Sequence, residues 1–359
     1  MASGVWPGNS DYERKAWNAL LEAATGVESP GWFEGLSQGL MDRAQQVASQ
    51  VRSGVEQLPG ATAAIGAADQ LTTKALETLH TVLVERGLNS VKPANVFAMF
   101  ADEGIAVGSY DEIRQLDLKL CDGSVPRRKE RYIALAVAEG AASSLAVTSA
   151  AVSSTVTGGA TLTVAASAVV ADVTVVMVGM GRIVALVAAH YGYDVREPDE
   201  QAFASGVIAY SVAGNSAEKA AALASLSRLT QQMMRQETWR HLQQRQATNV
   251  IQQVSMALGF RLAKRKLAQA VPLVGAVVNG GLNARIAHRT FERAQHAYRL
   301  RFLTEKHDLD AAQWAPDIVG DAVIDIPLID EVLDAELVAD SDGSSGGGQQ
   351  TGDEDLQQP

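Results

Sequence analysis

One stretch of the chain, residues 132–190, loses almost all of its charge and consists mainly of Ala, Val, Ser, Thr and Gly. No Asp, Glu, Lys, Arg or His occurs from Gly140 to Ala171, and Gly158-Gly159 interrupts the stretch near its middle. Small residues recur at every fourth position of its first half, which on a helix forms one stripe where a second helix can approach closely. The stretch therefore predicts a central helical hairpin within an all-α, multi-helix bundle.

Each arm of this hairpin is long enough to cross a bilayer, for which about 20 apolar residues suffice. Its composition favours a buried soluble core instead, because the first arm contains Glu139 and the second contains Asp172 and Arg182. A charge near the bilayer centre costs roughly 2.5–3.5 kcal/mol, whereas each Leu, Ile, Phe or Val contributes only about 0.3–0.6 kcal/mol. An integral membrane hairpin, and a soluble hairpin that opens onto a membrane surface, are the alternatives.

The charged residues of the hairpin are candidates for buried polar sites. A turn at 158–159 places Glu139 opposite Val178 and about one helical turn from Arg182. We predict an ion pair between Glu139 and Arg182, because buried charges are usually paired. Asp172 has no evident charged partner, and we expect it to bond to nearby hydroxyl groups rather than to have a functional role.

Charge is strongly segregated along the chain, which has a net charge of −11. Residues 228–306 carry 14 basic and 3 acidic side chains, whereas residues 307–359 carry no basic and 14 acidic side chains. Anionic lipid head groups attract basic side chains at about 1 kcal/mol each, so the basic region predicts contact with an anionic surface. The predicted contact residues are Arg261, Lys264, Arg265, Lys266, Arg285, Arg289 and Arg293.

Two other roles for the basic region stay open. The charges could simply be solvated and paired with acidic residues of the same chain. Nucleic acid also attracts Lys and Arg, but this partner is disfavoured because no aromatic interleaving or known base-reading motif accompanies the charge.

Turn residues and composition divide the chain into three parts. An N-terminal tail (1–10) precedes a helical domain (11–306), and an acidic, largely disordered tail (307–359) follows it. Inside the domain, the hairpin is followed by basic C-terminal helices over 217–306, where one long helical region extends from 217 to about 268.

The acidic tail contains one amphipathic segment, residues 327–338, which predicts a short helix. Because this segment is tethered to the basic region, we expect it to dock there as an intramolecular partner and to compete with an anionic surface. Truncation at about Glu305 is then expected to strengthen binding to anionic vesicles.

Four short motifs follow one another along the helical part of the chain: Tyr12-Glu13 with Trp17, Ser29-Pro-Gly-Trp32, Tyr191-Gly-Tyr-Asp194 with Pro198, and Pro272-Leu-Val-Gly275 with Asn279 and Asn283. In this order they resemble the EcsC protein family, over about residues 11–304. The resemblance implies a bacterial, helical, cytoplasmic or membrane-associated protein. The founding member of the family is encoded beside the subunits of an ABC transporter, and no biochemical activity has been settled for the family.

Two motifs that would indicate a reaction, GxxxxGK[ST] and HExxH, do not occur in the sequence. His288, Glu292 and His296 share one helix face, but they extend over about 12 Å, so at most an adjacent pair could contribute to a metal site. A solvated or salt-bridged face is the favoured interpretation. Asn279 and Asn283 could line a polar pocket for a head group, although bonding to neighbouring backbone is favoured. We expect no cofactor.

These patterns lead to one functional hypothesis and its alternatives. The single cysteine, Cys121, excludes an internal disulfide and is typical of a reducing cytoplasm. We predict a non-enzymatic accessory or interaction protein, peripheral to the inner face of the cell membrane, whose partners are an anionic membrane surface or transporter subunits. The alternatives are a lipid- or small-ligand-binding protein, or an enzyme, that uses an apolar pocket at the hairpin, and an integral membrane hairpin protein.

Overall fold

The computed structural model describes residues 6–8, 10–25, 79–125, 160–235, 244–269, 275–316 and 324–335. Every regular element within these ranges is a helix, which confirms the all-α prediction. The elements are α1 (Asp11–Thr25), α4 (Leu79–Val82), η1 (Leu83–Gly87), η2 (Leu88–Ser90), α5 (Pro93–Asp102), α6 (Tyr110–Gln115), α7 (Leu118–Ser124), α9 (Ala160–His190), α10 (Pro198–Val212), α11 (Ser216–Arg235), α12 (Gln244–Gln269), α13 (Gly275–Lys306) and η4 (Ala311–Trp314).

Several helices begin at residues that are typical of helix N-termini. The Ser109 hydroxyl accepts a hydrogen bond from the backbone N–H of Glu112, whose own carboxylate accepts one from the backbone N–H of Gly108, so α6 has a reciprocal N-terminal cap. At α11, the side chain of Asn215 accepts from the backbone N–H of Glu218 at 2.8 Å. Proline occupies the first turn of both α5 and α10, where its missing N–H has no helical partner to lose.

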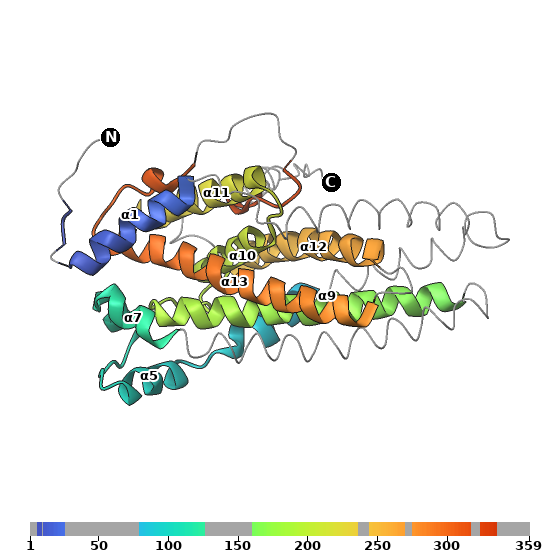
Figure 1. Ribbon diagram of the computed structural model, residues 1–359, viewed down its shortest axis with the longest axis horizontal. Coiled ribbons are helices and arrows are strands. Elements are labelled where there is room, and N and C mark those ends of the chain that lie inside the picture. The colour runs from blue at the N-terminus through green and yellow to red at the C-terminus, as the bar shows by residue number, and fades with distance from the viewer. Residues whose placement is uncertain are drawn as a thin grey trace, which may run out of the picture.

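Helix α9, the predicted second arm of the hairpin, lies at the centre of the bundle (Figure 1). It contacts α13, α10, α12, α4, α5, α7, η1 and η2. The approach of η1 is especially close, because a Cβ atom on Gly181 would lie 3.2 Å from the Cα atom of Gly87. The predicted first arm and the turn at 158–159 lie outside the described residues.

The burial of helix α9 bears on whether this segment is a core helix or a membrane span. By length and composition, Val169–His190 could cross a membrane, and among the described residues it is the one such segment. Within the bundle, however, 67% of its most apolar window is buried by other parts of the chain. This burial is what a core helix requires.

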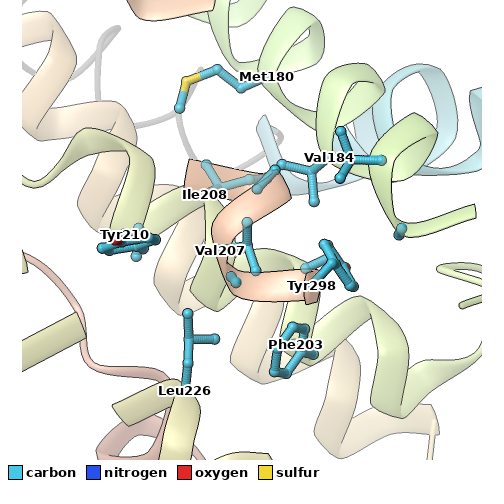
Figure 2. Packing of buried hydrophobic residues seen from close by; sticks show 14 of the residues in the cluster. Met180, Val184, Phe203, Val207, Ile208, Tyr210, Leu226 and Tyr298 are labelled. Atoms are coloured by element: carbon cyan, nitrogen blue, oxygen red, sulfur yellow. The ribbon is translucent and has the colours of Figure 1, made fainter. Parts of the chain in front are cut away.

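The core is built from the faces that α9, α10, α11 and α13 turn toward one another (Figure 2). Met180 and Val184 come from α9, Phe203 and Val207 from α10, and Tyr298 from α13 (Figure 2). All five are at most 1% exposed. Because apolar burial is the main favourable term in folding, this four-helix contact fixes the positions of the polar groups at its edges.

The region 217–268, predicted as one long helical region, contains two separate helices, α11 and α12. Residues 236–243 between them lie outside the described part. Both helices pack against α10. Apolar periodicity shows which residues of a helix face a core, but it does not show that two successive helices share one neighbour.

Parts of the segment that the sequence analysis set apart as an acidic tail pack against the bundle. Trp314 is completely buried, and its indole N–H donates to the hydroxyl of Thr304 at 3.1 Å. Residues 329–335 form a short helix within the predicted 327–338. Ile329 and Leu333 on this helix are 1% exposed and belong to the core.

Candidate functional site

The most concentrated group of functional side chains surrounds Arg301 near the C-terminal end of α13. Its Nη1 and Nη2 atoms donate to the two carboxylate oxygens of Glu200 at 2.7 and 2.6 Å, and its Nε donates to Glu305 at 2.6 Å. The guanidinium also lies over the rings of Tyr193 and Phe203, 4.1 and 4.4 Å from their centroids. The side chain of Arg301 is only 4% exposed, so the pair is shielded from solvent.

Three elements bring these groups together. Glu200 lies in the first turn of α10, where the helix dipole favours a negative charge. Tyr193 lies in the link between α9 and α10, and its hydroxyl donates to Glu305 at 2.9 Å. Gly192 takes a φ of +85° in this link, and a Cβ there would lie 2.6 Å from the carbonyl oxygen of Tyr110. The sequence Tyr191-Gly-Tyr-Asp194 therefore needs its glycine to present the tyrosines to α13.

The surroundings of Arg301 favour its charged form. Burial opposes the charge, but Glu200 and Glu305 outweigh this effect and raise the pKa of the guanidinium well above its ordinary value. Burial raises the pKa of Glu200, against the lowering effect of Arg301. Burial and Glu305 likewise raise the pKa of Tyr193 well above its usual range, so its hydroxyl stays a donor.

A second cluster centres on Asp122 of α7. This carboxylate accepts hydrogen bonds from the hydroxyls of Tyr191 and Tyr12 at 2.5 and 2.8 Å, and it lies 3.1 Å from Nη2 of Arg299 on α13. Burial, and then the bond to Asp122, raises the pKa of Tyr12 to about 12. The cluster therefore joins α1, α7, α13 and the end of α9 through one carboxylate.

A third cluster centres on Glu13 of α1, which stands three residues after Ser10 in the pattern of a capping box. Ser10 caps the backbone N–H of Glu13 as expected, at 3.3 Å. The Glu13 carboxylate instead accepts from the backbone N–H of Leu118 at 2.9 Å and from Nζ of Lys306 at 2.7 Å, and it lies 2.8 Å from Nε2 of His307. Glu13 is 1% exposed, so it links α1 and α7 to the end of α13.

Together these three clusters form an ionic clamp, by which we mean the side chains of Arg299, Arg301, Glu305, Lys306 and His307 with their partners Glu13, Asp122 and Glu200. Each partner carboxylate comes from a different helix. The clamp has the geometry of a structural lock, because all three nitrogens of the Arg301 guanidinium already donate to carboxylates.

The predicted anionic-surface residues fall into three groups. Arg261 lies 2.7 Å from Glu218 and 3.2 Å from Asp325, with its side chain 9% exposed. Arg293 donates to the carbonyls of Tyr210 and Ala213 at 2.5 and 2.8 Å, which caps the C-terminus of α10. Both guanidinium groups are thus directed into the protein.

Two other members of the predicted set, Arg285 and Arg289, are half-buried on the N-terminal half of α13. The remaining three, Lys264, Arg265 and Lys266, lie on α12. Their side chains are outside the described part of the structure.

The predicted buried polar residues are spread over α9 and α13. Glu139 lies outside the described residues, so its ion pair with Arg182 stays a prediction. Nε of Arg182 donates to the carbonyl of Arg86 at 2.9 Å, which ties α9 to η1. Asp172 is 5% exposed on α9. Asn279 and Asn283 lie on α13 as predicted, but their side chains are outside the described part.

The three residues considered for metal binding separate into a pair and a single residue. Nε2 of His288 lies 3.0 Å from Glu292 on the exposed side of α13. His296 lies 3.2 Å from the hydroxyl of Tyr210 and 3.2 Å from the carbonyl of Leu20. Within the described residues, no group of three His, Cys, Asp or Glu side chains is arranged to hold a metal ion.

The model of the EcsC protein family matches residues 145–303, which include α9 to α12 and nearly all of α13. This region belongs to the EcsC family. No curated protein and no solved structure matches the chain. The matched region is shorter than the predicted resemblance over 11–304, so the motifs at Tyr12 and Trp32 lie outside it.

The EcsC region supplies Glu200, Arg299 and Arg301 to the clamp, whereas Glu13 and Asp122 come from the part of the chain that precedes it. Sequence reasoning missed these clamp residues, because Arg299 and Arg301 appear in the sequence only as part of the basic region 228–306. The Arg301–Glu305 spacing of four residues is a local signal of pairing. The partners from distant helices have no such local signal.

Proposed function

We propose that this EcsC-family chain is a non-enzymatic accessory protein that binds an anionic membrane surface, at the inner face of the cell membrane. The contact is made by the N-terminal half of α13 and the basic cluster at the end of α12. The setting suggested by the family resemblance is an ABC-transport system, whose membrane subunits would be the protein partner.

The observation that carries this proposal is the division of cations along α13. Its C-terminal arginines are used by buried carboxylates, whereas Arg285 and Arg289 keep part of their surface exposed. Lys264, Arg265 and Lys266 precede the end of α12 by only a few residues, and α13 begins at Gly275. Partly exposed cations can interact with anionic head groups at about 1 kcal/mol each.

The clamp supports an accessory role rather than catalysis. A catalytic acid or base must reach a substrate and exchange a proton with it. The Glu200 carboxylate instead has both oxygens bonded to Arg301, and its side chain is only 10% exposed. We therefore assign this strongest cluster of ionisable groups to holding the bundle together.

Co-sedimentation with phosphatidylserine-containing vesicles tests the membrane proposal. The double variant Arg285→Glu/Arg289→Glu is expected to bind roughly 30-fold more weakly, from about 1 kcal/mol for each side chain. The matched control is Lys92→Glu/Lys119→Glu, which makes the same charge change at two exposed positions, the N-cap of α5 and the first turn of α7. Equal binding by the two variants, or equal binding of the wild type to phosphatidylcholine vesicles, would contradict the proposal.

The expected competition between the acidic tail and an anionic surface, which we call shielding, is better tested by a truncation other than the one at Glu305. A chain ending there would lose the buried Trp314 and the core residues Ile329 and Leu333. Removing residues 336–359 deletes acidic side chains and keeps these contacts. In the same vesicle assay this shorter chain is expected to bind more tightly at low salt, and an unchanged affinity across a salt series would remove the shielding idea.

A further inference from the structure

Residues 324–335, which we call the C-terminal strap, lie against the helices α10, α11 and α12. Ile329 contacts Gly206 of α10, Asp330 bonds to α11, and Asp325 pairs with Arg261 of α12. The apolar side chains of the strap, Ile326, Leu328, Ile329 and Leu333, are all buried. The strap therefore fills a groove with a mixed apolar and polar lining.

The floor of this groove includes Gly206, which has no side chain. A Cβ atom on Gly206 would lie 2.8 Å from Cγ2 of Ile329 and 2.9 Å from Cδ2 of Leu226. Both distances are shorter than a Cβ atom tolerates, so any other residue at 206 would require Ile329 of the strap or Leu226 of α11 to move. Glycine at this position thus leaves room for a branched apolar side chain between α10 and α11.

The wall of the groove is built to receive a carboxylate. The two oxygens of Asp330 accept hydrogen bonds from the hydroxyl of Ser225 and from Nε of Arg228. Asp330 is 5% exposed, and burying a carboxylate requires such partners. The Arg228 side chain is 46% exposed, so this cation can be approached from solvent. An Ile-Asp pair followed by Leu333 one helical turn later fits these features.

The groove lies within the matched EcsC region, and its occupant lies outside it. Gly206, Ser225, Arg228 and Arg261 all belong to the matched EcsC region, whereas the strap lies beyond it. We propose that the groove is a docking site for an acidic amphipathic helix of a partner protein, and that the strap is its resident occupant. The partner helix carries a branched apolar residue followed by Asp, and a Leu four positions after the apolar residue.

A partner helix must compete with a strap that is held nearby by the chain itself. Such tethering produces an effective concentration on the order of millimolar. A free peptide therefore binds weakly while the strap is docked and more tightly when the strap is released. This proposal is independent of the membrane proposal, since vesicle binding and peptide binding are measured separately.

Fluorescence anisotropy with a labelled synthetic peptide of residues 324–338 tests the groove directly in the full chain. The strap is released by Ile329→Asp, which places a charge against Gly206 and Leu226. We expect this variant to bind the peptide at least about tenfold more tightly than the wild type does. Adding Arg228→Glu should weaken peptide binding at least about tenfold, because it removes the partner of a buried carboxylate.

The matched control for Arg228→Glu is Arg235→Glu, the same change at an exposed position on the same helix. It should leave peptide binding unchanged. Equal binding of a scrambled peptide with the same composition, or equal effects of the two arginine variants, would overturn the proposal. Dimerisation of the released variant without peptide binding would overturn it as well, because the groove would then serve a second copy of the chain.

A measurement on the unaltered protein covers the case in which Ile329→Asp fails to fold. Glutamyl endopeptidase can cleave after Glu331, which lies on the exposed side of the docked strap helix. Saturating peptide should displace the strap and accelerate this cleavage, as followed by mass spectrometry, and the scrambled peptide should not. An unchanged cleavage rate would show that the peptide does not displace the strap, and it would contradict the proposal.

Discussion

The N-terminal and C-terminal halves of α13 use the same residue type in opposite ways. Arg285 and Arg289 are half-buried near the start of the helix, whereas Arg299 and Arg301 contact carboxylates from α7 and α10. Arg293 lies between the two groups and caps α10. One helix therefore holds the bundle together at its C-terminal end and keeps partly exposed cations in its N-terminal half.

Helix geometry separates Arg301 from Arg285. At 3.6 residues per turn, a repeat of four residues advances by about 40° per step around the helix. Over the sixteen residues from Arg285 to Arg301 this drift reaches about 160°, so the two side chains leave nearly opposite sides of α13. Arg299, fourteen residues after Arg285, leaves α13 only about 40° away from it, so its contact with Asp122 depends on the position of α7.

The largest expected effect comes from removing a buried arginine in the C-terminal half of α13. Arg301→Met leaves Glu200 and Glu305 without their cation, and removing one partner of a buried ion pair costs about 3–5 kcal/mol. Urea denaturation followed by circular dichroism measures the loss, with Arg285→Met as the matched control. The double variant Arg301→Met/Glu200→Gln should recover part of it. If Arg301→Met lowered the free energy of unfolding no more than Arg285→Met does, the stabilising role of the ionic clamp would be contradicted.

The next largest effect concerns the link that presents the tyrosines to α13. Gly192→Ala puts an L-residue at a φ of +85°, which costs about 1–2 kcal/mol, and the overlap with Tyr110 and Arg114 adds about 1–3 kcal/mol. Gly179→Ala is the control, because a Cβ there meets nothing within 4 Å and alanine favours the helix. Thermal unfolding should show a marked loss of stability for Gly192→Ala and no loss for Gly179→Ala. Similar melting temperatures for the two variants would contradict the role of this link.

Local sequence signals predict much of the fold but only part of the site. The caps at Ser109 and Asn215, and the proline at the start of α10, lie where the pattern places them, because capping depends on neighbours three or four residues away. The composition of 160–190 likewise indicates a buried helix. The local pattern does not separate α11 from α12. The structure shows them as two helices that both pack against α10.

The site could not be predicted to the same extent, because its partners are far apart in the sequence. Glu13 matches a capping box, yet its carboxylate is used by Lys306 and His307 almost three hundred residues later. Arg301 looks like part of a basic surface until the neighbouring α10 is known. Periodicity assigns residues to a face of a helix, and only tertiary packing decides what that face meets.

The most direct test compares two arginines of α13 that lie eight residues apart. Arg293→Gln should lower the free energy of unfolding by about 1–3 kcal/mol, because it leaves the carbonyls of Tyr210 and Ala213 without their donor. Arg285→Gln, on the half assigned to external contacts, should change it by no more than about 0.5 kcal/mol. Both are measured by urea denaturation at neutral pH. Equal losses, or a larger loss at Arg285, would contradict the division of α13 into an inward and an outward half.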